Sequence, residues 1–222
     1  MLMWRSYHIY TSNRKMFLQI LDNLQNEYYN SKFFFVQYVD PIGFHFRLRV
    51  QSVEQQNIEL KINEYFGNIR ILKKVYDPEY TLFMDSLPIY EEYSVELTKF
   101  LVSYRDIPPH SYIEDIIKML LEHFRCNNIN FIQFYMSYWQ GYTRFQNKTQ
   151  QENLRQQLSR SLESPPFTNV ISILYPLEEQ HLNKEICFKF LHMTLNKFGF
   201  SIMDELVILS NYLEQHTISP QK

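Results

Sequence analysis

Residues 33–50, FFFVQYVDPIGFHFRLRV, leave few folds open to this chain. The first half is a strongly apolar, aromatic run with the composition of a buried strand. Residues 40–43, DPIG, then have the pattern of a tight turn, with proline at its second position and glycine at its end. Residues 44–50 alternate apolar and polar side chains, which is typical of a strand with two different faces. The segment therefore predicts two strands joined by a turn.

The neighbouring segments extend this pair of strands to a β-α-β-β-α-β order. Short alternating runs rich in aromatic and β-branched side chains predict strands, and longer runs with apolar residues at helical spacing predict helices. The expected elements are a strand at 4–10, a helix from a cap at Ser12 or Asn13 to about Tyr29, strands at 32–39 and 44–50, a helix from Ser52 or Glu54 to about Phe66, and a strand at 69–76. This order is that of a ferredoxin-like sheet, the split βαβ pattern.

The remainder of the chain has helical periodicity. Residues 77–88 are bounded by prolines and predict an irregular segment. Helices are expected at 89–105, 111–126, 130–147, 182–198 and 202–215, with an exposed polar segment at 148–163 and a break at 164–166. The simplest architecture is a single α+β domain over residues 1–222. Its sheet part would span residues 1–88, and a mainly helical part would span residues 89–222.

Composition excludes several classes of function. The chain has four glycines and contains neither GxGxxG nor GxxxxGK[ST], which argues against a nucleotide-binding loop. A net charge of −2 provides no bulk positive field for nucleic acid. Cys126 and Cys187 form no CxxC motif, so two buried thiols are expected rather than a disulfide or a zinc site. With no signal peptide and no apolar run of about 20 residues, we expect a cytoplasmic protein without metal or cofactor.

The alternation in residues 44–50 separates two chemistries. Phe44, Phe46, Leu48 and Val50 share one face of the predicted strand, and His45, Arg47 and Arg49 share the other, about 7 Å apart. Guanidinium groups bind carboxylates and phosphates through paired hydrogen bonds. This face is therefore a candidate receptor for a ligand with two anionic groups, provided that helices of the second half cover it. The alternative is a solvated polar face of an antiparallel sheet.

His192 lies among apolar neighbours within a predicted helix. Such a histidine is either a hydrogen-bonded core residue or a proton-transfer group, because imidazole titrates near neutral pH. Asn196 lies one turn later and can share its face. Glu79 follows the last predicted strand, where it could reach the basic face or form a loop salt bridge. The sequence leaves both alternatives open for His192 and for Glu79.

Other residues carry weaker signals. Tyr135, Tyr138 and Trp139 form an aromatic stripe that is more typical of a core than of a substrate-binding wall. Ser103 and Ser137 lack the strand-turn-helix context of a nucleophile elbow, so the sequence does not predict a hydrolase.

Several motifs together resemble the C-terminal, glutamate-eliminating domain of lantibiotic and thiopeptide dehydratases. Residues 33–50 are similar to that family's aromatic strand followed by "RY.DP" and "HLRLR". Trp4 and Tyr10 match its opening strand, and residues 76–79, YDPE, match its "Y.pE" element. Residues 191–197, LHMTLNK, match the closing "HMhlNR". The motifs follow the family order and cover nearly the whole chain.

The resemblance implies a lyase-type enzyme of ribosomal peptide antibiotic (bacteriocin) biosynthesis, in a stand-alone form. In that family the domain removes glutamate from glutamylated serine and threonine of a precursor peptide, leaving dehydroalanine or dehydrobutyrine. The expected partners are the precursor peptide and a separate glutamylation enzyme, which uses glutamyl-tRNA. No direct binding of nucleic acid or membrane is expected, and the helical second half offers a surface for a homodimer.

The resemblance also implies roles for individual residues. Arg47 and Arg49 would hold the glutamyl oxygens, and His192 would act as acid or base. These three are the implied catalytic residues, and the implied substrate-binding residues are His45, Glu79, Asn196 and Lys197. Within that set, Glu79 would bind the glutamyl ammonium group.

The chain departs from the family pattern at positions that carry arginine there. Gln37 and Leu82 replace two arginines, and Lys197 keeps a charge but loses the guanidinium fork. Arg70 and Arg105 are candidates to compensate. Two alternatives stay open, and the losses fit the first of them. One is a pyridine synthase that closes a thiopeptide ring from two dehydroalanines and needs no glutamate receptor. The other is a non-catalytic partner that binds the peptide by adding a strand to the sheet.

Overall fold

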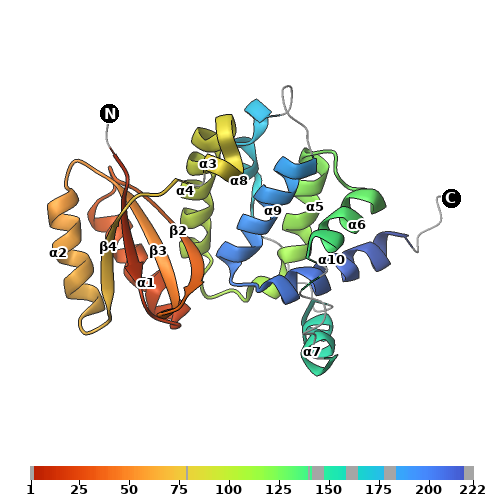
Figure 1. The fold of residues 1–222 in the computed structure, drawn as a ribbon, viewed down its shortest axis with the longest axis horizontal. Helices are drawn as coiled ribbons and strands as arrows, with labels where there is room; N and C mark the ends of the chain where they lie inside the picture. Colours follow the sequence, from red (N-terminus) through yellow and green to blue (C-terminus); the bar gives the residue numbers. More distant parts are fainter. Residues whose placement is uncertain are drawn as a thin grey trace. The chain divides into compact units, whose positions relative to one another are not determined.

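A computed structural model of the 222-residue chain describes residues 3–78, 80–139, 141, 148–158, 165–177 and 184–217. It comprises two compact units, Met1–Arg105 and Asp106–Lys222. The first contains the sheet and the second is built from helices (Figure 1). The predicted α+β class is confirmed.

The first unit follows the predicted element order. Its elements are β1 (Arg5–Ile9), α1 (Arg14–Glu27), β2 (Lys32–Asp40), β3 (Gly43–Gln51), α2 (Gln55–Phe66), β4 (Ile71–Val75), α3 (Tyr80–Phe83) and α4 (Leu87–Ser103). The four strands lie in the order β2-β3-β1-β4, and each neighbouring pair is antiparallel. β3 therefore lies between the parallel strands β1 and β2, which is the split βαβ arrangement expected from the sequence.

Local interactions explain where these elements begin and turn. The side chain of Asn13 accepts a hydrogen bond of 3.0 Å from the backbone N–H of Met16 and so caps α1. At the β2–β3 turn, Asp40 Oδ1 accepts hydrogen bonds from the backbone N–H groups of Ile42 and Gly43. Gly43 has a φ of 141°, which side chains other than glycine rarely adopt. This turn fixes the pairing of the two strands.

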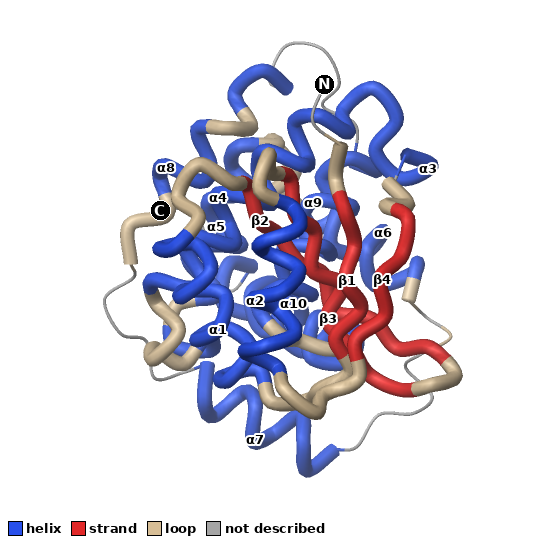
Figure 2. The backbone as a smooth tube through the Cα atoms, turned by 90° about the vertical axis from the view of Figure 1, so that its left-hand side faces the viewer, coloured by secondary structure: helices blue, strands red, loops and turns tan. Residues whose placement is uncertain are grey.

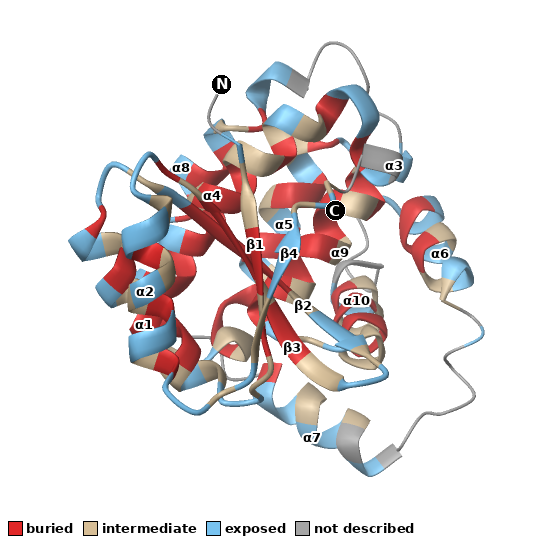
Figure 3. Ribbon diagram, turned by 60° about the vertical axis from the view of Figure 1, so that its left-hand side comes forward, coloured by how far each residue is buried: buried red, intermediate tan, exposed pale blue. Residues whose placement is uncertain are grey.

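One face of the sheet forms the core of the unit, with α1 and α2 covering it (Figure 2). The ring of Phe17 on α1 stacks on Phe46 at 4.0 Å between centroids, and it also contacts Phe35 and Phe66. Burial covers the first half of β2 and most of β3, whereas the outer strand β4 is largely exposed (Figure 3). The predicted apolar face of β3 thus packs into this core, although His45 and Arg49 on the other face are also buried.

The prediction that residues 77–88 are irregular is wrong from Tyr80 onwards. Helix α3 and a 3₁₀ turn at Met84–Ser86 lie there, and α4 begins at Leu87. Pro88 occupies the first turn of α4, where a backbone N–H needs no helical partner. The proline therefore opens a helix instead of bounding a loop, and four-residue helices are too short to show a period.

Although the helix predicted at 130–147 ends at Tyr138, with residues 142–147 outside the described ones, the second unit contains a helix in each region where periodicity predicts one. They are α5 (Ile113–His123), α6 (Ile129–Tyr138), α7 (Lys148–Leu158), α8 (Thr168–Ser172), α9 (Lys184–Phe198) and α10 (Ile202–Thr217). The polar segment predicted at 148–163 contains α7, its residues 159–163 lie outside the described ones, and the short α8 was not expected. Cys126 and Cys187 are both buried free thiols, as predicted.

Two further features concern only the part of the chain that the structure describes. None of its helices is long and apolar enough to cross a membrane. No three of its His, Cys, Asp or Glu side chains gather where they could hold a metal ion.

Phe46→Ala should destabilise the protein by about 3–5 kcal/mol, because it removes a fully buried ring and leaves a cavity against Phe17. Phe44→Ala is the matched control, since Phe44 lies on the same strand and face but is only partly buried. Urea unfolding monitored by circular dichroism measures both losses. Equal losses would contradict this account of the core.

Candidate functional site

Strand β3 presents His45, Arg47 and Arg49 on the sheet face opposite the aromatic core. The register adds residues from the strands on either side. Ser6 and His8 of β1 pair with Arg49 and Arg47, and Tyr38 of β2 pairs with His45. We call His8, His45, Arg47 and Arg49 the basic face. The sequence-based assignment of the two guanidinium groups and the imidazole to one face agrees with this register.

Arg47 has hydrogen-bonding capacity to spare. Its guanidinium carbon lies 3.4 Å from the centroid of the Tyr38 ring, a stacked cation–π contact. Its Nε donates to His45 Nε2 at 3.3 Å. Within the described residues, its two terminal nitrogens donate to no acceptor, and the side chain is partly exposed. The ring and the imidazole therefore hold the guanidinium in place and leave its fork open to an anion.

His45 is fully buried and supports Arg47. Arg47 Nε can only donate, so Nε2 of His45 must carry the lone pair, and the ring proton must be on Nδ1. That nitrogen lies 3.2 Å from the carbonyl oxygen of Gly43, which accepts the proton. The rings of His8 and Tyr10 pack against His45 at 4.8 and 4.7 Å. Both nitrogens of His45 are thus used within the chain.

Arg49 is the buried member of the basic face, with 1% of its surface exposed. It donates a hydrogen bond to Ser6 Oγ, and its guanidinium carbon lies 5.2 Å from the Tyr76 ring centroid. Glu91 of α4 accepts hydrogen bonds from Tyr76 Oη at 2.6 Å and from Trp4 Nε1 at 2.9 Å. Glu91 therefore orders the aromatic surroundings of Arg49. Sequence reasoning missed it, because nothing in its spacing marks it.

The charge of this face comes from the guanidinium groups of Arg47 and Arg49, with Lys74 of β4 on the same side of the sheet. Burial, followed by the charges of Arg47, His45 and Arg49, lowers the pKa of His8 to about 4. Burial is also the main cause that lowers the pKa of His45, with Arg47 and Arg49 acting in the same direction. Both imidazoles are therefore neutral at pH 7. A ligand approaching this face meets fixed positive charge from arginine.

The opposite face carries charge that is already paired. A hollow of about 510 Å³ is lined there by residues that include Arg5, Glu59 and Lys73. Arg5 and Lys73 both form ion pairs with Glu59, at 3.5 and 2.5 Å. Both cations thus share one carboxylate within the chain, whereas the terminal nitrogens of Arg47 donate to no described acceptor, so the basic face is the better candidate for an anion.

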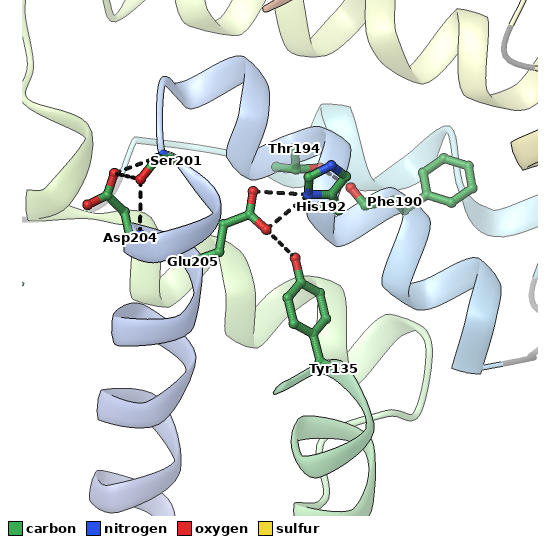
Figure 4. A network of polar contacts seen from close by, with 7 residues as sticks. All are labelled: Tyr135, Phe190, His192, Thr194, Ser201, Asp204 and Glu205. Atoms are coloured by element: carbon green, nitrogen blue, oxygen red, sulfur yellow. Dashed lines mark hydrogen bonds and ion pairs between the residues drawn. The ribbon is translucent and has the colours of Figure 1, made fainter. Parts of the chain in front are cut away.

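In the second unit, His192 of α9 forms a polar network with two residues from other helices (Figure 4). Its Nδ1 lies 3.0 and 2.9 Å from Oε1 and Oε2 of Glu205 on α10. Tyr135 of α6 donates its hydroxyl to Glu205 Oε2 at 2.6 Å. The His192 side chain is 25% exposed and that of Glu205 only 1%. No partner of His192 Nε2 lies within the described residues.

Aromatic rings surround this imidazole. Trp139 lies 5.1 Å from the His192 ring, and Phe188 stacks nearly parallel to it at 6.2 Å. The aromatic stripe predicted as core is therefore divided. Tyr135 is fully buried but hydrogen-bonds to Glu205, Tyr138 is 61% exposed, and Trp139 lies beside the histidine.

Burial governs the protonation of the network. It raises the pKa of Glu205, although the hydrogen bonds and charge of His192 and the Tyr135 hydroxyl act in the opposite direction. Burial and the neighbouring Glu205 carboxylate raise the pKa of Tyr135 well above its ordinary value. Tyr135 therefore stays protonated and remains a donor. Sequence reasoning missed Glu205, although a carboxylate on the otherwise apolar face of a helix was a usable signal.

The remaining predicted site residues have diverse positions. Asn196 and Lys197 follow His192 on α9, where Asn196 is partly exposed and Lys197 is fully buried. Glu79 lies outside the described residues.

Arg70 and Arg105, the two arginines that could compensate for the missing ones, differ in their contacts. Arg70 lies with its guanidinium carbon 5.5 Å from the Tyr10 ring, next to the basic face. Arg105 pairs with Asp22 at 3.0 Å and donates to the carbonyl oxygen of Val102. The sites around Arg47 and His192 belong to different compact units.

Comparison with known proteins gave one family match. The family model described as lantibiotic biosynthesis dehydratase C-term matches residues 4–217. No curated protein matches.

Among solved structures, the tRNA-dependent lantibiotic dehydratase MibB from Microbispora sp. 107891 is similar at 14% identity and a TM-score of 0.59. The alignment covers 97% of this chain but 28% of MibB, so the chain spans little more than a quarter of that protein. The pyridine synthase TbtD from thiomuracin biosynthesis is similar at 10% identity and a TM-score of 0.49, over 99% of this chain and all of TbtD. At these identities the likeness to MibB establishes the fold alone.

His8 should make stability depend on pH in a definite direction. The folded protein keeps His8 neutral down to about pH 4, whereas the unfolded chain protonates it below its ordinary pKa of 6.5. Stability should therefore fall as the pH drops from 6.5 towards 4. His8→Gln should remove about 1–2 kcal/mol of this loss, after allowance for solvent screening. Urea unfolding at pH 7 and pH 4.5 measures it, with His110→Gln as a control outside the basic face. An unchanged slope in His8→Gln would contradict the neutral state of His8.

Proposed function

Since the chain belongs to the lantibiotic biosynthesis dehydratase C-terminal family, we propose that it eliminates glutamate from glutamylated serine and threonine of a precursor peptide. The products would be dehydroalanine and dehydrobutyrine. The observation that carries the proposal is the open guanidinium fork of Arg47 on a face whose imidazoles are neutral. A carboxylate leaving group needs such a receptor.

The reaction needs one proton acceptor and one stabilised leaving group. A base removes the α-proton of the esterified residue, and that electron pair forms the Cα–Cβ double bond. The bond from Cβ to the ester oxygen breaks, and glutamate departs as a free carboxylate. No oxidant or reductant is required. Catalysis can therefore come from fixed positive charge and one correctly placed base.

We assign the leaving group to the basic face. Arg47 would bind the departing carboxylate through its two terminal nitrogens, because Tyr38 and His45 already hold the rest of its guanidinium. Arg49, beneath the surface, would contribute a second positive charge to the potential at that point. In this proposal His45 acts by orienting Arg47, which refines the substrate-binding role implied by the family motif.

We assign the proton transfer to His192, whose side chain is 25% exposed and whose Nδ1 is held by Glu205. The assignment of Arg47 and His192 to one reaction rests on the family motifs that contain them. Substrate-binding roles for Asn196, Lys197 and Glu79, the last for the glutamyl ammonium group, rest on the same motifs. The precursor peptide and a separate glutamylation enzyme are the proposed partners, and the cytoplasm is the proposed compartment.

A pyridine synthase is the second candidate function. It is favoured by Leu82, which is 41% exposed at a position where the eliminating family has an arginine. A formal cycloaddition of two dehydroalanines releases no glutamate and needs no receptor at that position. The two functions differ in substrate, so product analysis separates them.

The wild-type protein should remove one free glutamic acid from each ester of a precursor peptide that the glutamylation enzyme has modified. Mass spectrometry before and after addition of the protein measures this loss. His192→Ala should lower the rate by about 10²–10⁴-fold, the usual contribution of an acid or base. If the glutamyl adducts remain unchanged after addition of the wild-type protein, the elimination proposal is wrong. Ring formation with leader release from a fully dehydrated peptide would support the pyridine synthase instead.

Arg47→Gln should lower kcat for elimination by about 10²–10³-fold, because it removes the charge that stabilises the leaving carboxylate. Arg47→Lys should recover part of the activity, since it restores charge without the fork. Arg5→Gln is the matched control, because Arg5 lies in the same sheet but on the opposite face, paired with Glu59. If Arg5→Gln and Arg47→Gln lose activity equally, the basic face is not the receptor.

A further inference from the structure

We propose that Glu205 and Tyr135 are positioning residues that hold His192 in a single tautomer, with Nε2 free to accept the substrate proton. This inference rests on the proposed function, because it specifies how the base of that reaction is prepared. Neither residue belongs to the motifs from which His192 was identified. The inference comes from the geometry of three helices around one buried carboxylate (Figure 4).

Burying the Glu205 carboxylate costs free energy. Its side chain is 1% exposed, and an ionised carboxylate in such a place is unfavourable unless hydrogen bonds satisfy it. Both oxygens lie within 3.0 Å of His192 Nδ1, and Oε2 also accepts from the Tyr135 hydroxyl at 2.6 Å. Leucine or methionine would fill this apolar position more favourably. The presence of a carboxylate at position 205 is therefore better explained by its hydrogen bond to His192 than by a contribution to stability.

The N-terminal cap of α10 fixes the backbone of Glu205. Helix α10 begins with a reciprocal cap, in which the backbone N–H of Ser201 donates to Asp204 Oδ2 at 2.8 Å and the N–H of Asp204 donates to Ser201 Oγ at 3.2 Å. The N–H of Glu205 donates to the carbonyl oxygen of Ser201 at 2.9 Å. Glu205 thus lies in the first, capped turn, so its backbone is fixed before its side chain reaches His192.

The Glu205 carboxylate determines the tautomer of His192. A carboxylate only accepts hydrogen bonds, so Nδ1 of His192 must carry the proton that lies between them. In the neutral ring, Nε2 then carries the lone pair and can take a proton. Tyr135 donates to the same carboxylate and prevents it from rotating away. This is the arrangement by which a buried carboxylate orients an imidazole base in other enzymes.

The same carboxylate also stabilises the positive charge that forms on His192 during the reaction. When Nε2 takes the α-proton, the ring becomes an imidazolium whose Nδ1–H faces Glu205, and the ion pair stabilises the new charge. Among the described residues, the ionisable groups that act on this pair include Tyr135 on α6, Asp204 beside Glu205, and Cys187, which acts on Tyr135. Trp139 and Phe188 flank the ring with apolar surface. The proton then leaves Nε2 for water, since glutamate departs already ionised.

The tautomer can be measured without any substrate. In the full-length protein labelled with ¹⁵N-histidine, long-range ¹H–¹⁵N spectra at pH 8 should show His192 with its proton on Nδ1. Glu205→Ala should convert it to a mixture in which Nε2–H is substantial. Glu214→Gln is the matched control, because it removes a carboxylate of the same helix that pairs with Arg155 and not with His192, and it should keep the Nδ1–H form. Nε2–H as the main form in wild type, or an unchanged tautomer in Glu205→Ala, would overturn the proposal.

Kinetics then distinguish positioning from a merely structural role. Glu205→Gln keeps the shape of the side chain but loses its charge, so kcat for elimination should fall by about 10²–10⁴-fold with KM nearly unchanged. Tyr135→Phe should lower kcat by about tenfold, the effect of one hydrogen bond. Normal kcat in a folded Glu205→Gln would contradict the inference. If wild type shows the Nδ1–H tautomer but eliminates no glutamate, the proposed function fails while the positioning of His192 stands.

Discussion

The register of β3 against its two neighbours decides both the core and the chemistry of the first unit. Because side chains alternate along a strand, a slip of one residue would turn Arg47 into the core and Phe46 out of it. The Asx-type turn at Asp40 prevents this slip by binding the backbone of Ile42 and Gly43. The stack of Phe17 on Phe46 then anchors one face, and the stack of Arg47 on Tyr38 orders the other. Stability and the proposed anion site thus depend on the same pairing of strands.

In the second unit, burial of Glu205 lowers stability at a residue that the proposed chemistry needs. Burial raises the pKa of Glu205, so the folded protein binds that proton more tightly than the unfolded chain does. Stability therefore decreases as the pH rises from the ordinary glutamate pKa through the raised value, and it is lower once the carboxylate is ionised. The hydrogen bonds from His192 and Tyr135 reduce this penalty without removing it. A residue kept for packing alone would not carry such a penalty.

The sequence was informative where the determining interactions are local. Alternation in residues 44–50 and the turn at residues 40–43 predicted the strands and the basic face, because a strand's two faces depend only on neighbouring residues. The short helix α3 was missed because four residues carry no period. The supports of the two sites were missed for a different reason. Glu91 holds Trp4 from 87 residues away and Glu205 holds Tyr135 from 70 residues away, and no local pattern encodes such pairs. Only the position of Glu205 on an apolar helix face gave a hint.

The register also changes the significance of the arginines that this chain lacks. Gln37 pairs with Phe46, so it lies on the core side of the sheet and not with Arg47. An arginine at that position would not add a guanidinium to the basic face, and the loss there is not a loss of receptor charge. Leu82 is different, because it is exposed on α3 and takes no part in the core. Arg105 is committed to Asp22, whereas Arg70 lies beside Tyr10, whose ring packs on His45. If a further cation helps to bind the glutamyl group, Arg70 is better placed than Arg105 to supply it, and the receptor would then extend along β1 rather than towards α3.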